Sequence, residues 1–384
     1  MIKQTIIAKT FYGLEKVLAK EIESIGGENI QFLNRAVKFD GDKKLLYKAN
    51  LYLRTALRII VPVFKFRADN YDDLYSAAVQ LSWEKFLGPD DTFFIDGVVF
   101  SKSFPHSHYA ALRLKDAIAD RFFKKFNKRP SVNKERPDYV INLHITNNQC
   151  NISLDSSGDS LHKRGYKLKN VKAPLNEVLA AGLIKLSGWN NTQTLVDPMC
   201  GSGTLPIEAN LISNKIPPGI YRKEFGFQRW KSYDQKIWDS LLSEANSEVY
   251  SSADILGRDI SEKAVDISEI NAKNAFHKQN IDFAVQSLEN FDPPKNLNGM
   301  VIMNPPYDKK MKKQDIELFY KEIGDILKKK YNGYQVWIFS YNKEAMKQIG
   351  LRPTEKYNLF NGPLKCLFYC YPIFSGSLRQ RKLV

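Results

Sequence analysis

Three short stretches carry residues that could bind or react with a ligand, and the first is the glycine loop from Asp197 to Thr204, DPMCGSGT. It lies between the apolar run TLV and the helical pattern LPIEANLI. A chain that passes from a strand through glycines into a helix brings its backbone and the helix N–H groups close to a ligand. The lysine of a phosphate loop and the GxGxxG spacing are both missing. We therefore predict a ligand-binding loop that is neither an NTPase loop nor a dinucleotide fingerprint.

The second candidate is Asp259, which ends the strand-like run ILGRD. A carboxylate at this position can accept hydrogen bonds from both hydroxyls of a ribose. Asp259 lies much further from the glycine loop than the usual spacing of about 20 residues, because residues 214–250 are inserted. The alternative is that Asp259 only caps the helix that follows at Ile260 and Ser261.

The third candidate is the turn Asn304, Pro305, Pro306, Tyr307, directly after the apolar run GMVIM. Two consecutive prolines end a strand and form a rigid turn at the carboxyl edge of the sheet, where open α/β sheets bind ligands. The side-chain oxygen of Asn304 and the carbonyl of Pro305 can accept hydrogen bonds from an exocyclic amino group, and Tyr307 offers a face for a base to stack on. This turn is therefore predicted to be functional, with ordinary turn chemistry as the alternative.

Basic side chains accompany these stretches. Lys309 and Lys310 follow the third candidate and are predicted to clamp phosphates, with a solvated helix start as the alternative. The join between the two halves of the chain, LHKRGYKLKNVK, has no acid and includes Lys163, Arg164 and Lys167. It connects to a second domain and is either available to phosphates or simply solvated.

The elements that must position these residues change character near residue 155. The first half combines helical patterns with strand patterns; the helices are expected at Gly13–Ile25, Tyr71–Phe86 and Tyr109–Phe126, and the strands at Leu57–Phe66, Thr92–Phe100 and in a hairpin across Val140–Leu154. The second half alternates apolar runs at 194–197, 255–259, 281–285, 299–304 and 334–340 with helical patterns, and ends in a hairpin around Asn361 and Gly362. We predict an α+β region followed by a parallel α/β sheet with an antiparallel edge.

Composition limits the class of protein. The 384 residues include 57 Lys and Arg against 42 Asp and Glu, a net charge of +15 that predicts a polyanionic partner. Four cysteines are too few for a disulfide scaffold, and Cys366 and Cys370 lie in an apolar pattern without a histidine pair, so we expect core packing and no metal. No window approaches the ~18 apolar residues of a membrane helix and no signal segment opens the chain. A soluble cytoplasmic protein is expected.

The motifs DPMCGSGT, GRDIS and NPPY, in this order, resemble the class I S-adenosylmethionine-dependent methyltransferases that modify exocyclic amines of nucleobases. Upstream, GLEKVLAKEIESIG, LRLKDAIADRFFKKFNKRPSV and the join resemble the bacterial THUMP-domain methyltransferases, and the chain is most similar to the 23S rRNA guanine-N2 group. The resemblance implies a ferredoxin-like segment at 1–55, a THUMP RNA-binding domain at 56–157 and a Rossmann-like class I methyltransferase domain at 158–384. It also implies that no room is left for the second catalytic domain of some relatives.

The resemblance further implies roles for single residues. Contacts with S-adenosyl-L-methionine are expected from Asp197, Pro198, Cys200, Gly201, Gly203, Thr204, Asp259, Ser287 and Asn304. The catalytic loop is expected to be Asn304, Pro305, Pro306 and Tyr307, and RNA contacts are expected from Lys163, Arg164, Lys167, Lys309 and Lys310. Two positions depart from the family pattern. Ser261 replaces a second acid after Asp259, and Ser287 stands where relatives place an Asp beside the adenine ring, so adenine recognition falls to Ser287 or to the backbone.

The expected activity is methylation of guanine N2 in 23S rRNA, as free RNA or in a ribosomal precursor, with no obligate protein partner. Guanine-N2 methylation of tRNA would use the same parts. N6-adenine methylation of DNA shares NPPY but does not explain an RNA-binding first half. A noncatalytic RNA-binding assembly factor would not need an intact Asn304 and Tyr307.

Overall fold

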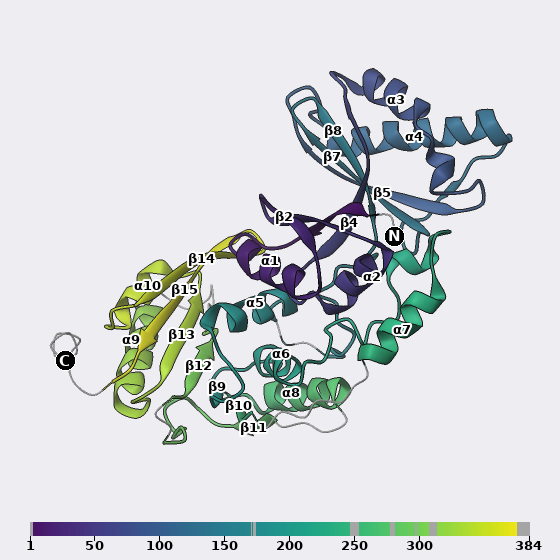
Figure 1. Cartoon of the computed structure of the whole chain (residues 1–384). Helices are drawn as coiled ribbons and strands as arrows, with labels where there is room; N and C mark the ends of the chain where they lie inside the picture. Colours follow the sequence, from purple (N-terminus) through teal and green to yellow (C-terminus); the bar gives the residue numbers. More distant parts are fainter. Residues whose placement is uncertain are drawn as a thin grey trace. The chain divides into compact units, whose positions relative to one another are not determined.

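The computed structural model describes residues 3–169, 171, 174–245, 253–276, 281–295, 298–306 and 313–374. The chain divides into two compact units, whose elements are labelled in Figure 1. Unit 1 comprises residues 1–10, 18–161 and 222–244, and unit 2 comprises residues 11–17, 162–221 and 245–384. Each unit therefore includes a short segment that the sequence order places in the other half.

Unit 1 contains one mixed eight-stranded sheet in the order β2-β3-β1-β4-β8-β7-β5-β6. Its strands are β1 (Gln4–Lys9), β2 (Glu28–Leu33), β3 (Ala36–Gly41), β4 (Arg58–Arg67), β5 (Thr92–Phe100), β6 (Ser131–Val132), β7 (Tyr139–Thr146) and β8 (Gln149–Asp155). The predicted hairpin is confirmed as β7 and β8, with Asn147 in the left-handed region at φ 51°. The strands predicted at Leu57–Phe66 and Thr92–Phe100 are confirmed as β4 and β5.

The helices of the first half are α1 (Glu15–Ser24), α2 (Lys43–Tyr52), α3 (Tyr71–Gln80), the 3-10 turn η1 (Trp83–Lys85) and α4 (Ser107–Phe126). Asp42 and Asn70 cap α2 and α3 by accepting backbone N–H groups of the first turn. The helix predicted to reach Phe86 is too long. The chain leaves the helix after Gln80 because Trp83 is fully buried and its indole N–H donates to the Ala78 carbonyl at 2.8 Å.

Residues 222–244 of the inserted segment pack within unit 1, where η2 (Gly226–Arg229) and α7 (Gln235–Ala245) form. Aromatic side chains hold it there: Phe227 stacks on Tyr47 with ring centroids 4.1 Å apart, and Trp230 stacks on Tyr139 at 6.2 Å. A Cβ added to Gly226 would lie 2.8 Å from the backbone nitrogen of Gly158, so the backbones meet directly. The segment thus belongs with the first half, although it lies between strands of the second.

Unit 2 contains a seven-stranded sheet in the order β11-β10-β9-β12-β13-β15-β14. Its strands are β9 (Leu195–Asp197), β10 (Ile255–Asp259), β11 (Ile281–Val285), β12 (Met300–Met303), β13 (Gln335–Ser340), β14 (Glu355–Asn361) and β15 (Leu364–Pro372). β9 to β13 are parallel, and the hairpin β14–β15 adds antiparallel to β13. The predicted α/β sheet with an antiparallel edge is confirmed. Because the strand order reverses between β9 and β12, their carboxyl ends flank a topological switch point.

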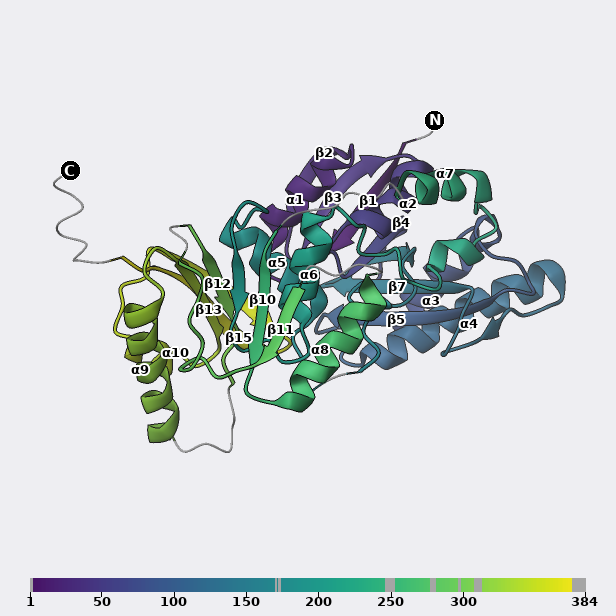
Figure 2. The same ribbon diagram turned by 90° about the horizontal axis from the view of Figure 1, so that it is seen from below.

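The helices of this unit form two groups. The first group is α5 (Glu177–Ser187), α6 (Thr204–Ser213) and α8 (Glu262–Ala275), and the second is α9 (Lys313–Lys330) and α10 (Lys343–Gln348). α6 and α8 contact β10, β11 and each other. α9 and α10 pack against β12 and β13 in a core that includes Tyr320, Val301 and Ile338, and Figure 2 shows them apart from α6 and α8. Among the described helices, none is long and apolar enough to cross a membrane.

Candidate functional site

Asp197 is the last residue of β9 and is buried, with 2% of its surface exposed. One carboxylate oxygen accepts the backbone N–H of Met199 at 3.2 Å. Burial is the main cause that raises the pKa of Asp197 to about 8, and the nearby Asp259 charge adds to the effect. Asp197 therefore holds a proton at neutral pH until a cation approaches it.

The glycine loop that follows has glycines at two turn positions, on either side of the buried Ser202. Gly201 and Gly203 have φ of +58° and +76°, which other residues rarely adopt. A Cβ on Gly203 would lie 3.0 Å from the Cβ of Ser268, so the loop packs closely against α8. Gly203 caps α6, whose first residue, Thr204, is buried. The loop is a backbone cradle at the start of a helix, as predicted.

Two further members of the predicted cofactor set, Pro198 and Cys200, are buried in the same loop. The Cys200 N–H donates to the Arg258 carbonyl at 2.8 Å, which ties the loop to β10. Burial raises the pKa of the Cys200 thiol well above its ordinary value. Cys200 is therefore suited to pack in the loop rather than to act as a nucleophile.

Asp259 ends β10, the strand beside β9. Its Oδ2 accepts the Gly201 N–H at 3.0 Å and its Oδ1 accepts the Ser261 N–H at 3.0 Å. The residue that caps α8 is Ser261, which accepts the Ala264 N–H, so the capping alternative for Asp259 is wrong. Each carboxylate oxygen keeps a second lone pair that could accept a hydroxyl. This arrangement fits a ribose diol.

Apolar side chains that the sequence interpretation missed lie beside Asp259. Ile260 is 76% exposed, and Val285, the register partner of Asp259 on β11, is 51% exposed. Ser287 is half-buried, and its hydroxyl oxygen accepts the Asn290 N–H at 3.2 Å, which leaves its own hydrogen to donate. An exposed apolar residue directly after a strand-ending acid was the available signal. Ile260 and Val285 together offer an apolar contact for a flat ring.

The catalytic-loop candidate follows β12, which pairs with β9. Asn304 is half-buried, Pro305 is buried and Pro306 is exposed. Because β9 and β12 are adjacent and parallel, this turn and the glycine loop lie at the same edge of the sheet. Tyr307, Lys309 and Lys310 lie outside the described residues.

The basic join differs from its prediction. Arg164 is 2% exposed and lies 3.4 Å from the Glu208 carboxylate in α6. Lys167 pairs with Glu177 at 2.8 Å, and both side chains are largely buried. Arg164 and Lys167 are placed inside unit 2 rather than on its surface, so direct contacts with RNA phosphates do not suit them. Lys163 is exposed.

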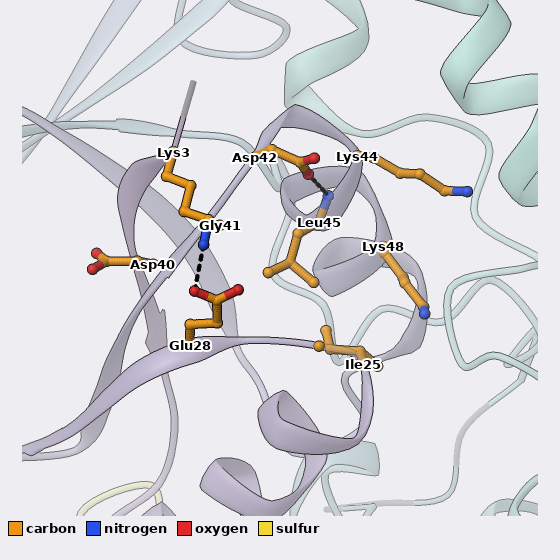
Figure 3. A pocket seen from close by; sticks show the side chains of 10 residues that line it. Lys3, Ile25, Glu28, Asp40, Gly41, Asp42, Lys44, Leu45 and Lys48 are labelled. Carbon is orange, nitrogen blue, oxygen red and sulfur yellow. Dashed lines mark hydrogen bonds and ion pairs between the residues drawn. The ribbon is translucent and has the colours of Figure 1, made fainter. Parts of the chain in front are cut away.

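A cavity of about 330 Å³ lies elsewhere, in unit 1, and is lined by residues of β2, β3 and α2 and by Lys3 (Figure 3). Two of its three basic residues form ion pairs: Lys3 contacts Glu28 at 2.5 Å, and Lys44 contacts Glu244 at 2.9 Å. This neutralised lining does not favour a phosphate. The described residues contain no group of three His, Cys, Asp or Glu side chains that could hold a metal ion.

Three models of known protein families match the chain. The family model described as RMKL-like, methyltransferase domain matches residues 164–369. Models of a THUMP domain and of an RlmL ferredoxin-like domain match residues 68–155 and 5–60. The resemblance found in the motifs is thereby confirmed.

Individual relatives extend over nearly the whole chain. It is 37% identical over 370 residues to "Putative RNA methyltransferase slr0064" of Synechocystis sp., covering 94% of this chain and 95% of that protein. It is 36% identical over 366 residues to "Ribosomal RNA large subunit methyltransferase K/L" of Syntrophotalea carbinolica, covering 92% of this chain and 51% of that protein. The chain thus spans about half the length of the K/L relative. Among solved structures, SMU.472, "a putative methyltransferase complexed with SAH", has a TM-score of 0.87 at 28% identity, covering 98% of this chain and 100% of that chain.

Proposed function

Because the chain belongs to the family of RMKL-like methyltransferase domains, we propose that it transfers a methyl group from S-adenosyl-L-methionine to N2 of a guanine in large-subunit (23S) rRNA. The observation that carries this proposal is the meeting of three sequence motifs at one sheet edge. The glycine loop follows β9, Asp259 ends β10, and Asn304 follows β12, and these strands are neighbours.

The edge fits the parts of the cofactor one by one. Burial raises the pKa of Asp197, and a cation beside it would favour its ionised form and offset the cost of burying that charge. The positively charged methionyl end of the cofactor would be such a cation. Asp259 would hold the ribose hydroxyls, and Ile260 and Val285 would contact the adenine ring. When bound, the cofactor supplies a methyl group already activated on a sulfonium.

Asn304 and Pro305 would act on the accepting nitrogen. The lone pair of an aromatic amine is delocalised into the ring, which makes the nitrogen a poor nucleophile. If the Asn304 side-chain oxygen and the Pro305 carbonyl accept its two N–H groups, they favour a pyramidal nitrogen and stabilise the positive charge that develops on it. The nitrogen forms the new N–C bond as the S–C bond breaks, and one proton leaves to water. This step requires no strong base.

The substrate class is supported by the first half of the chain and by the relatives. The name of the Syntrophotalea protein supports large-subunit rRNA, and the THUMP match supports an RNA rather than a DNA substrate. Guanine N2 is supported by the likeness of the motifs to guanine-N2 enzymes.

One face of the unit 1 sheet is suited to single-stranded RNA. α4 covers the other face. A Cβ built on Gly97 of β5 points to that face and would lie 3.3 Å from the carbonyl oxygen of Ser107, the first residue of α4. On the uncovered face, Phe100 is 65% exposed, with its ring centroid 6.0 Å from that of His144. Burial lowers the pKa of His144, which keeps the ring neutral at pH 7. A base could stack on this pair of rings.

Cations lie across the same face. Lys65 and Arg67 on β4 are exposed, and β8 connects them in register to β7. Aromatic rings flanked by cations form the usual combination for binding a single strand. We call this surface, Phe100, His144, Lys65 and Arg67, the aromatic-basic face.

The test is methyl transfer from labelled S-adenosyl-L-methionine to 23S rRNA and tRNA from a strain that lacks the gene, and to DNA, followed by nucleoside analysis. We expect N2-methylguanosine in 23S rRNA. Asn304→Ala should abolish transfer and keep cofactor binding, whereas Asn358→Ala, on the exposed edge strand β14, should remain active. Label only in tRNA, or only as N6-methyladenosine, would contradict the substrate. Full activity of Asn304→Ala would contradict the mechanism.

A further inference from the structure

A segment of the join, residues 165–169, runs along α8 and is called the strap. Its first part is held by Asn274, whose side-chain N–H groups donate to the carbonyls of Gly165 at 3.3 Å and Tyr166 at 2.8 Å. The Tyr166 hydroxyl is fully buried and donates to the Glu208 carboxylate at 3.1 Å. The strap is therefore anchored at its beginning.

Asn271 holds the end of the strap. Its side-chain oxygen accepts the backbone N–H groups of Leu168 at 3.0 Å and Lys169 at 3.3 Å. Its side-chain nitrogen donates to the Lys169 carbonyl at 3.0 Å and to the Ser202 carbonyl in the glycine loop at 3.2 Å. All the hydrogen-bonding groups of this amide are thus used, with no part of the residue exposed. One side chain joins the strap to the glycine loop.

Neighbouring contacts agree with this role. The Ser268 hydroxyl, one turn earlier on α8, lies 2.8 Å from the Gly201 carbonyl. Beyond the strap, a side-chain carbon of Val171 lies 3.8 Å from the position that a Cβ on Gly201 would take. Val171 therefore lies close to the glycine loop, and Ser268 of α8 is hydrogen-bonded to the same loop.

We propose that Asn271 is a positioning residue for S-adenosyl-L-methionine: it fixes the strap against the glycine loop before the cofactor binds. A buried amide that satisfies four backbone groups is costly to replace, because each group that loses its partner stays desolvated. A preformed strap spares the cofactor the entropic cost of ordering it. This inference rests on the proposed use of the cofactor at this edge.

The first measurement uses the unmodified protein. Hydrogen exchange at the amides of Leu168 and Lys169 should already be slow without ligand, and should change little on adding S-adenosyl-L-homocysteine. Fast exchange that becomes slow only with the ligand would overturn the inference, because the ligand rather than Asn271 would then order the strap.

The second measurement uses variants. Asn271→Ala should raise the Kd of S-adenosyl-L-homocysteine and the KM of S-adenosyl-L-methionine by at least about tenfold, with kcat at saturating cofactor within about twofold. Asn274→Ala is the matched control, since Asn274 lies on the same helix and binds the same strap but donates to Gly165 and Tyr166. It should shift the Kd by less than about twofold. If Asn271→Ala does not fold, Asn271→Asp, which keeps the acceptors and loses both donors, replaces it.

The outcomes separate this inference from the proposed function. An unchanged Kd for the Asn271 variant, an equal effect of Asn274→Ala, or a loss confined to kcat would overturn the positioning role. A normal protein that binds S-adenosyl-L-homocysteine but does not methylate rRNA would refute the substrate alone. A normal protein that does not bind S-adenosyl-L-homocysteine would refute the proposed function itself.

Discussion

Cofactor binding should release a proton from Asp197, and the Asp197→Asn variant should not release it. With a pKa of about 8 in the free protein, Asp197 is about nine-tenths protonated at pH 7. A cation bound beside it lowers this pKa, so binding of S-adenosyl-L-homocysteine, whose amino group carries that charge, should expel roughly 0.9 proton. Calorimetric titration at pH 7 in buffers with different heats of ionisation measures this number directly.

The difference in proton release between the unmodified protein and Asp197→Asn gives the contribution of Asp197. Asparagine keeps an oxygen to accept the Met199 N–H, so the variant removes the titrating carboxyl and retains this contact. Asp282→Asn, an exposed acid on β11 paired with Arg258, is the control and should release as much as the normal protein. Equal proton release from the normal protein and Asp197→Asn would refute the reasoning, because Asp197 would then not face the charged end of the ligand.

The same group predicts a pH dependence of stability without ligand. The folded-state pKa of Asp197 is raised from 3.8 to about 8, so the folded protein binds more protons than the unfolded chain. The stabilisation of the folded protein by this proton uptake is fully present below about pH 4. It is lost as the pH rises towards about 8, and the free energy of unfolding falls by at most about 1.4 kcal/mol per pH unit. Urea unfolding of Asp197→Asn should therefore show a growing advantage over the normal protein from pH 5 to pH 8. An advantage that is constant across this range would contradict the assigned shift.

Two further substitutions test the packing and the RNA surface. Gly257→Ala would place a Cβ 2.5 Å from the Phe283 ring and should lower the free energy of unfolding by about 1–3 kcal/mol; an unchanged urea midpoint would show that the ring moves aside freely. Phe100→Ala should weaken the binding of single-stranded RNA by about 1–3 kcal/mol in a filter-binding assay with little loss of stability, since the ring is 65% exposed. Phe123→Ala, 49% exposed on α4, is its control, and equal weakening by both would argue against the aromatic-basic face.

The sequence could predict those strands and helices whose bounds depend on residues close together along the chain. Apolar runs bounded by glycines and acids predicted the parallel strands, because a strand buried on both faces needs a continuous apolar run. Residues 255–259 and 281–285 were predicted to their final residues as β10 and β11. The end of α3 was missed, because burial of Trp83 overrides a helical pattern that continues past Gln80.

Contacts between distant residues could not be predicted in the same way. Arg164 stands in a stretch without acids, so it was interpreted as an exposed cation, yet the fold supplies Glu208 from 44 residues further on. A charge pattern shows which charged residues are close in sequence, but not which distant residues the fold brings into contact. Asn271 was missed for the same reason, since its partners at Leu168 and Ser202 are backbone groups that carry no sequence signal.

The inserted segment shows where this limit matters for function. Its aromatic residues read locally as part of the second half, but Phe227 packs on Tyr47, 180 positions earlier along the sequence. The insertion separates the glycine loop from Asp259 along the chain, while β9 and β10 remain adjacent in the sheet. Spacing in sequence therefore fails as a test for a nucleotide site once an insertion leaves the sheet and returns. What such a site must retain is the order of its strands and the residue types at their carboxyl ends, because these alone fix which groups meet the ligand.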